Sequence, residues 1–119
     1  MTVVLATLAL IVPHSEAKTP VHHKHHKCDH VCGSLRYMRR IVRPYDWKLE
    51  RMAGCESSHR WHINTGNGFY GGLQFTLSTW WSMRGRGYPH QHSELEQKYR
   101  AVKLIHRAGY GPWPVCGYV

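Results

Sequence analysis

Residues 47–58 read Trp-Lys-Leu-Glu-Arg-Met-Ala-Gly-Cys-Glu-Ser-Ser, and this stretch decides the fold. Leu49, Met52 and Ala53 recur at the i, i+3 and i+4 positions that share one face of an α-helix. Glu56 follows at i+7, so the pattern predicts a helix whose apolar face ends in a carboxylate. Burial and the negative end of the helix dipole both disfavour a charged carboxylate, which raises its pKa toward the range that a general acid needs. The alternative is an ordinary glutamate in water at a frayed helix end.

The whole chain is short and strongly basic. Its 119 residues suffice for one small domain, and 16 Lys and Arg against 7 Asp and Glu give a formal net charge of +9. Such a surface favours binding to a polyanion, and the candidates are nucleic acid, anionic lipid and an anionic wall polymer. No groove-reading or base-stacking module is evident in the sequence, so we expect no nucleic acid partner. The four cysteines are an even number, as in secreted proteins with disulfides.

The first 43 residues are expected to lie outside the main domain. Residues 1–17 contain an apolar run that is too short to span a bilayer and that precedes small residues, as in a secretory signal peptide. Residues 18–43 are predicted to form a basic linker or arm rich in His and Arg. We therefore expect a secreted or wall-associated protein that meets the membrane only transiently, during export.

The arm contains two further patterns. Cys28 and Cys32 do not have a standard zinc-site spacing, so a local disulfide is preferred to a metal site, and no metal or cofactor is expected. Residues 34–43 carry apolar residues at helical spacing with arginines between them. This segment is either a basic amphipathic helix that rests on an anionic surface or an ordinary helix packed on the domain.

Polar residues at helix starts predict the helices of the main domain. Asp46 is expected to cap the helix that leads to the acid, and Thr76 is expected to cap the next one. Ser93, with a glutamate three residues later, predicts a capping box before a last helix that Gly109 ends.

Glycine-containing turns occupy the segment between these helices. Asn67-Gly68 predicts a hairpin turn between two short, aromatic-rich strands. Gly71-Gly72 would weaken a strand, which suits a place where a ligand approaches the backbone closely. The predicted order is therefore helix, small hairpin, helix, helix and an irregular tail.

Glu56 is the one carboxylate followed by residue types that bind sugars. Trp, Tyr, Gln, Asn and Gly come after it, and no Asp or Glu occurs before Glu94. Most glycosidases use two facing carboxyl groups, whereas one acid suffices when the substrate supplies its own nucleophile. The muramyl 6-hydroxyl of peptidoglycan can attack its own C1 and leave a 1,6-anhydro end, which is the lytic transglycosylase reaction.

Short motifs are spread over the second half of the chain. They are Cys55-Glu56-Ser57, Ile63-Asn64-Thr65-Gly66-Asn67-Gly68, Tyr70-Gly71-Gly72-Leu73-Gln74-Phe75, Ser78-Thr79-Trp80 and Trp113-Pro114-Val115-Cys116. In order and spacing they resemble the catalytic domain of the actinobacterial resuscitation-promoting factors, which are lysozyme-like enzymes that cleave cell walls. The resemblance covers about residues 47–119. It implies an α+β, mainly α, lysozyme-like fold with a small β-hairpin in a domain of residues 44–119.

The resemblance also implies roles for single residues. Glu56 corresponds to the catalytic acid, Cys55 pairs with Cys116, and Thr79 and Gln74 help to line the substrate cleft. The other candidate substrate-binding residues are Asn64, Tyr70, Gly71, Gly72 and Trp61.

We therefore expect a secreted enzyme that cleaves the β-1,4 bond between MurNAc and GlcNAc in peptidoglycan. Glu56 would protonate the leaving oxygen and then serve as the base. A lytic transglycosylase-type product is expected, with lysozyme-like hydrolysis as the other outcome. The alternative function is a cationic wall- or membrane-binding protein on the same scaffold, with little or no catalysis. The expected partners are peptidoglycan glycan strands and anionic cell-wall polymers, and the expected state is a monomer.

Overall fold

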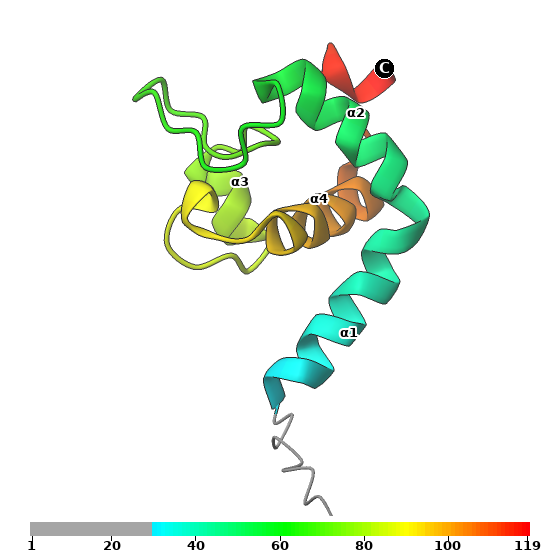
Figure 1. The fold of residues 1–119 in the computed structure, drawn as a ribbon. Coiled ribbons are helices and arrows are strands. Elements are labelled where there is room, and N and C mark those ends of the chain that lie inside the picture. Colours follow the sequence, from blue (N-terminus) through cyan, green and yellow to red (C-terminus); the bar gives the residue numbers. More distant parts are fainter. Residues whose placement is uncertain (1–29) are drawn as a thin grey trace, which may run out of the picture.

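Four α-helices form the described part of the chain, residues 30–119 of this computed structural model (Figure 1). They are α1 (His30–Val42), α2 (Asp46–Ser57), α3 (Leu77–Ser82) and α4 (Glu94–Ala108). Three short 3₁₀ helices are η1 (Arg43–Tyr45), η2 (Pro89–Gln91) and η3 (Cys116–Tyr118). The predicted mainly α class is therefore confirmed.

Several predictions fall outside the described residues. They concern the signal peptide, the linker before residue 30, and the pairing of Cys28 with Cys32, because the side chain of Cys32 is not described either. Within residues 30–119, no helix is long and apolar enough to cross a membrane.

α2 is the helix around which the others are arranged. Figure 1 shows α1 leading into α2 through a bend at η1, and it shows the C-terminus returning to α2. Leu49, Met52 and Ala53 of α2 are fully buried, so the predicted apolar face is confirmed. They belong to one core with Trp80 of α3 and Val102 of α4.

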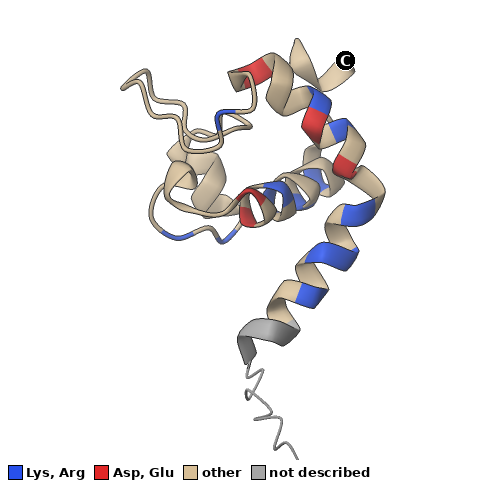
Figure 2. Ribbon diagram, viewed as in Figure 1, with Lys and Arg blue, Asp and Glu red and all other residues tan. Residues whose placement is uncertain are grey.

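α1 is packed against the rest of the molecule. Met38 and Val42 are buried, and the ring of Tyr37 lies edge-on to Tyr99 of α4 with the ring centroids 6.1 Å apart. Of the two interpretations of residues 34–43, packing on the domain is therefore confirmed. Arg36, Arg39 and Arg40 of α1 are nevertheless exposed, and the helix contains no acidic residue. Figure 2 shows these basic positions along the coloured part of α1.

The predicted hairpin is a loop without strands. In the described part of the chain, β-pairing is confined to two isolated antiparallel bridges, Asn64 with Tyr70 and Tyr70 with Phe75. The Asn64 side chain accepts a hydrogen bond from Gly66 N at 3.1 Å, and the Asn67 side chain accepts one from Phe69 N at 3.0 Å. Because these side chains satisfy backbone donors locally, the chain turns here without forming a ladder. The prediction of a turn was right, and the prediction of strands was wrong.

Two of the predicted helix caps are present. Thr76 Oγ1 accepts a hydrogen bond from Thr79 N at 3.3 Å at the start of α3. Ser93 Oγ accepts one from Glu96 N at 3.2 Å at the start of α4. The carboxylate of Glu96 does not complete a capping box, because it accepts from Arg100 Nε at 2.8 Å. Both helices therefore begin where their sequences predicted.

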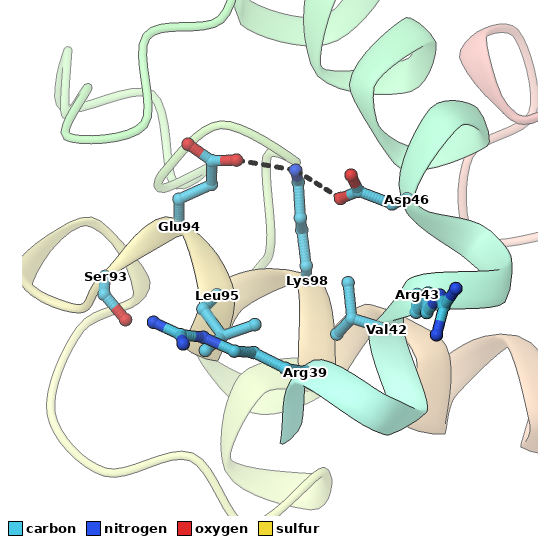
Figure 3. Close-up of a pocket in the computed structure, with 8 residues that line it drawn as sticks. All are labelled: Arg39, Val42, Arg43, Asp46, Ser93, Glu94, Leu95 and Lys98. Carbon is cyan, nitrogen blue, oxygen red and sulfur yellow. Dashed lines mark hydrogen bonds and ion pairs between the residues drawn. The ribbon is translucent and has the colours of Figure 1, made fainter. Parts of the chain in front are cut away.

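Asp46 does not cap α2, and that prediction was wrong. Asp46 is the first residue of the helix, and its carboxylate accepts a hydrogen bond from Lys98 Nζ of α4 at 2.7 Å. Glu94 accepts from the same nitrogen at 2.6 Å, as Figure 3 shows, and Glu50 also contacts it. These residues, here called the Lys98 network, join the first half of α2 to α4.

Candidate active site

Glu56 lies in the last turn of α2, partly buried. Burial raises its pKa above the ordinary value, which is the direction expected from the sequence. The helix ends because Ser58 has a left-handed backbone, with a φ of 54°, and its N–H returns to Gly54 O at 3.0 Å. A carboxyl group with a raised pKa keeps its proton to higher pH, so Glu56 is suited to donate one.

The residues on either side of Glu56 connect it to other parts of the fold. Cys55 is bonded to Cys116, with the Cα atoms 5.6 Å apart, so the implied pairing is confirmed. Ser57 Oγ donates a hydrogen bond to Gly72 O at 2.9 Å. The backbone at Glu56 is therefore held both by a covalent bond to the tail and by a hydrogen bond to the glycine-rich loop.

Two cavities that share lining residues lie beside the C-terminal end of α2. A cavity of about 290 Å³ is lined by Glu56, Phe69, Gln74 and tail residues 112–116. A narrower hollow of about 50 Å³ shares Phe69, Gln74 and part of the tail and extends to Thr79. We call the two together the Glu56 cleft. Among the described residues, no carboxylate other than Glu56 lines it.

Gln74 lines the cavity that contains Glu56, and Thr79 lines only the narrower hollow beside it. Gln74 has a left-handed backbone, with a φ of 51°, and its Nε2 donates to Gly71 O at 2.9 Å. Such a backbone is uncommon outside glycine and is concentrated at functional sites. Thr79 Oγ1 accepts from Thr76 Oγ1 at 2.9 Å, which leaves the Thr79 hydroxyl proton for another partner. Both side chains thus present fixed polar groups along the cleft.

Gly71 and Gly72 are explained by packing within the protein. A Cβ atom at Gly72 would lie 2.3 Å from the Trp61 ring, and one at Gly71 would lie 2.3 Å from the side chain of Gln97. Gly72 N also donates to Gln97 Oε1 at 2.9 Å. The close approach inferred from this glycine pair is therefore real, but the protein's own side chains fill the space.

Trp61, Tyr70 and Asn64 also lie outside the lining of the Glu56 cleft. Trp61 lines a separate cavity of about 510 Å³. Tyr70 stacks on His90 and meets Tyr88 edge-on, with ring centroids 5.7 and 5.2 Å apart. Asn64 uses its side chain inside the turn described above. The structure thus does not bring these candidates together with the acid.

Phe69 and tail residues 112–115 also line the cleft, although the sequence did not single them out as site residues. Phe69 is 46% exposed, and an exposed aromatic ring suits stacking on a sugar. The implied pairing of Cys116 with Cys55 was a signal that could have located the tail. Phe69 had no such signal, because only the path of the whole loop brings it next to Gln74.

The Lys98 network explains why the other acidic residues of α2 do not join Glu56. Burial alone would lower the pKa of Lys98, but its hydrogen bonds with Asp46, Glu50 and Glu94 raise it. Burial alone would raise the pKa of Glu50, but Lys98 keeps it below the ordinary value. These carboxylates are therefore partners of a buried ammonium group, and Glu56 is the acid of the cleft.

Known families and proteins match the part of the chain that forms this site. A family model described as a transglycosylase-like domain matches residues 44–116. The chain is 58% identical over 67 residues to resuscitation-promoting factor Rpf of Micrococcus luteus, in a match that covers 56% of this chain and 30% of that protein. For RpfE of Mycobacterium tuberculosis the identity is 44% over 73 residues, which cover 61% of this chain and 42% of RpfE. For Rpf1 of Corynebacterium glutamicum the identity is 43% over 74 residues, which cover 60% of this chain and 37% of Rpf1. The chain thus spans less than half the length of these relatives.

Proposed function

The chain belongs to the transglycosylase-like domain family, and from this premise we propose that it cleaves the β-1,4 bond between MurNAc and GlcNAc in peptidoglycan. The observation that carries the proposal is the Glu56 cleft, in which a carboxyl group with a raised pKa shares a groove with Phe69, Gln74 and Thr79. These residue types stack on sugar rings and form hydrogen bonds with sugar hydroxyls.

In the proposed reaction Glu56 carries out both proton transfers. Its protonated carboxyl group donates to the glycosidic oxygen while the bond from that oxygen to C1 of MurNAc breaks. The 6-hydroxyl of the same MurNAc attacks C1 and gives its proton to the Glu56 carboxylate. The products are a GlcNAc with a free hydroxyl and a 1,6-anhydro MurNAc end, and the acid is protonated again without consuming water.

The composition of the cleft favours this intramolecular attack over hydrolysis. Most hydrolytic glycosidases use a second carboxyl group, about 5–5.5 Å away as a nucleophile or about 6.5–9.5 Å away to activate water. In the described part of the chain, the cleft lining contains no such group, and Asp46 and Glu50 are bound to Lys98. The 6-hydroxyl of the substrate would then supply the nucleophile.

The proposed substrate lies outside the cell membrane, so the proposal includes export to the wall. The apolar run of residues 1–17 supports export, and the exposed arginines of α1 support attraction to anionic wall polymers.

The mass of the released fragments tests the reaction type. We expect the oxidised protein to release muropeptides with 1,6-anhydro ends from purified peptidoglycan, each lighter by one water than a hydrolysis product. Reducing ends would show that the enzyme is a hydrolase and that a distant group positions water. Sedimentation of the protein with the wall, without any release, would support the wall-binding alternative and exclude catalysis.

A further inference from the structure

A pocket lined by basic side chains lies at the junction of α3 and α4. It has a volume of about 230 Å³, and its lining residues are Ser82, Met83, Arg84, Lys103 and Arg107. Three of these are cationic and none is acidic. Figure 2 likewise shows basic positions in the loop after α3 and along α4. We call this cavity the Lys103 pocket.

The positive charge of the Lys103 pocket is not balanced within the described part of the protein. Burial lowers the pKa of Lys103, and the neighbouring Arg100 and Arg84 lower it further. The nearest opposing charge is Glu96, but its carboxylate already accepts two hydrogen bonds from Arg100. Bringing an anion into the pocket would therefore relieve a repulsion that the fold leaves in place.

The walls of the pocket are fixed by hydrogen bonds at the end of α3. Met83 O accepts from Arg100 Nη1 at 2.9 Å and from Lys103 Nζ at 3.4 Å. Ser82 Oγ donates to Thr79 O at 2.8 Å. Lys103 is thus held at the end of α3, while Arg84 and Arg107 line the same pocket as exposed side chains.

The Lys103 pocket and the Glu56 cleft are lined by separate residues of the same two helices. On α3, Thr79 lines the cleft and Ser82 lines the pocket one turn later, which is about 5 Å along the helix. On α4, Leu104 lines the cleft, and the neighbouring Lys103 lines the pocket. Side groups of a polymer bound in the cleft would therefore lie near the pocket.

We propose that the Lys103 pocket binds a carboxylate of the peptide stem that the glycan in the cleft carries. This inference rests on the proposed function, because it takes peptidoglycan as the polymer in the cleft. The stem is attached to MurNAc, so its carboxylates are tethered beside the bond to be cleaved and have a high effective concentration at the pocket. Arg84 and Arg107 have planar guanidinium groups, which pair with carboxylates through two parallel hydrogen bonds.

The test compares soluble glycan strands that carry peptide stems with the same strands after an amidase has removed the stems. The variant is Arg84→Gln with Arg107→Gln, since both side chains are exposed and lie outside the catalytic cleft. We expect kcat/KM on stem-bearing strands to fall about tenfold, through a higher KM, as expected for two partly exposed charged contacts. On stem-free strands the variant and the parent should be equally active.

The control variant is Arg43→Gln with Arg51→Gln, which removes the same charge from exposed positions outside both the pocket and the cleft. It should cleave both kinds of soluble strand like the parent. The pocket assignment would be overturned if the pocket variant were as active as the parent on stem-bearing strands. It would also be overturned if the variant lost the same activity on stem-bearing and stem-free strands. A loss seen only on walls that carry phosphodiester polymers would overturn it as well, because phosphate would then be the ligand. If the parent cleaves neither kind of strand, the proposed function itself fails.

Discussion

At the scale of single residues, Glu56 joins two properties that a proton donor needs. Its pKa is raised by burial, and its backbone is held by Cys55 on one side and Ser57 on the other. The sequence predicted the first property from helical spacing, because a residue at i+7 lies on the same face as the core residues. The second depends on Gly72 and Cys116, which lie far along the chain and come close only in the fold.

Replacing Glu56 with Gln should abolish most of the activity and leave the fold intact. Glutamine has the same shape but cannot deliver a proton, and general acid catalysis contributes on the order of 100- to 10,000-fold. We expect release of muropeptides to fall by that factor, measured with purified peptidoglycan, while binding to the wall persists. The matched control is Glu50→Gln, which alters the Lys98 network but not the cleft. If Glu56→Gln cleaves like the parent, Glu56 is not the acid.

The raised pKa of Glu56 also predicts how stability depends on pH. The folded protein binds the proton of the Glu56 carboxyl group more tightly than the unfolded chain does. Its contribution to the free energy of unfolding is therefore complete below the pKa that Glu56 has in the unfolded chain. That contribution is lost as pH rises through the higher pKa of the folded protein. The Glu56→Gln variant carries no buried charge. Its thermal midpoint should therefore exceed that of the parent at mildly alkaline pH, and the difference should vanish in acid. Cleavage by the parent should likewise decline as pH rises and Glu56 loses its proton.

Other residues of the site could not be assigned from the sequence. Gly71 and Gly72 correctly indicated a close approach to the backbone, but a glycine does not specify whether a ligand or a protein side chain approaches. In the structure Trp61 and Gln97 occupy that space. Phe69 was missed for a related reason, because the acid and the tail residues that line the cleft with it lie in other parts of the chain.

At the scale of elements, helices were more predictable than strands. Thr76 and Ser93 mark the starts of α3 and α4 through local hydrogen bonds that short stretches of sequence already contain. The prediction of strands was wrong because strand pairing needs free backbone groups. Here the side chains of Asn64 and Asn67 already accept hydrogen bonds from the backbone N–H groups of Gly66 and Phe69.

The packing of α1 on α4 changes what removal of the arm should do. Deleting residues 18–43 takes Met38 and Val42 out of the core, and losing large buried side chains costs about 2–5 kcal/mol each at fully buried sites. The deletion should therefore lower the free energy of unfolding, measured in denaturant, as well as weaken binding to the wall. Unchanged stability after deletion would show that α1 is not part of the fold.

The charge of α1 can be separated from its packing by the Arg36→Gln, Arg40→Gln variant, because both side chains are exposed. This variant should unfold like the parent and bind whole wall more weakly at low salt, with the difference disappearing at high salt. Its cleavage of soluble strands should be unaffected.

At the scale of the whole molecule, the Cys55–Cys116 disulfide is the main covalent restraint within residues 30–119. It joins residues 61 positions apart, and in the chain-entropy model a loop of that size contributes about 4 kcal/mol. Reduction, or replacement of both cysteines by Ser, should lower the thermal midpoint substantially, as measured by calorimetry with and without reductant. Activity measured well below that midpoint should also fall, because the tail forms one wall of the cleft. A reduced protein with unchanged stability and activity would contradict this role.

Because α2 is joined to the rest of the protein at both ends, its length is the dimension of this protein that can change least. Asp46 and Glu50 meet Lys98 near one end, and Cys55 meets Cys116 near the other. Each residue of an α-helix turns the chain by about 100°. A single insertion or deletion between Glu50 and Cys55 would therefore rotate one attachment out of register with the other, and the acid with it. Surface loops elsewhere can grow or shrink at small cost, so changes of length in this domain should accumulate outside this helix.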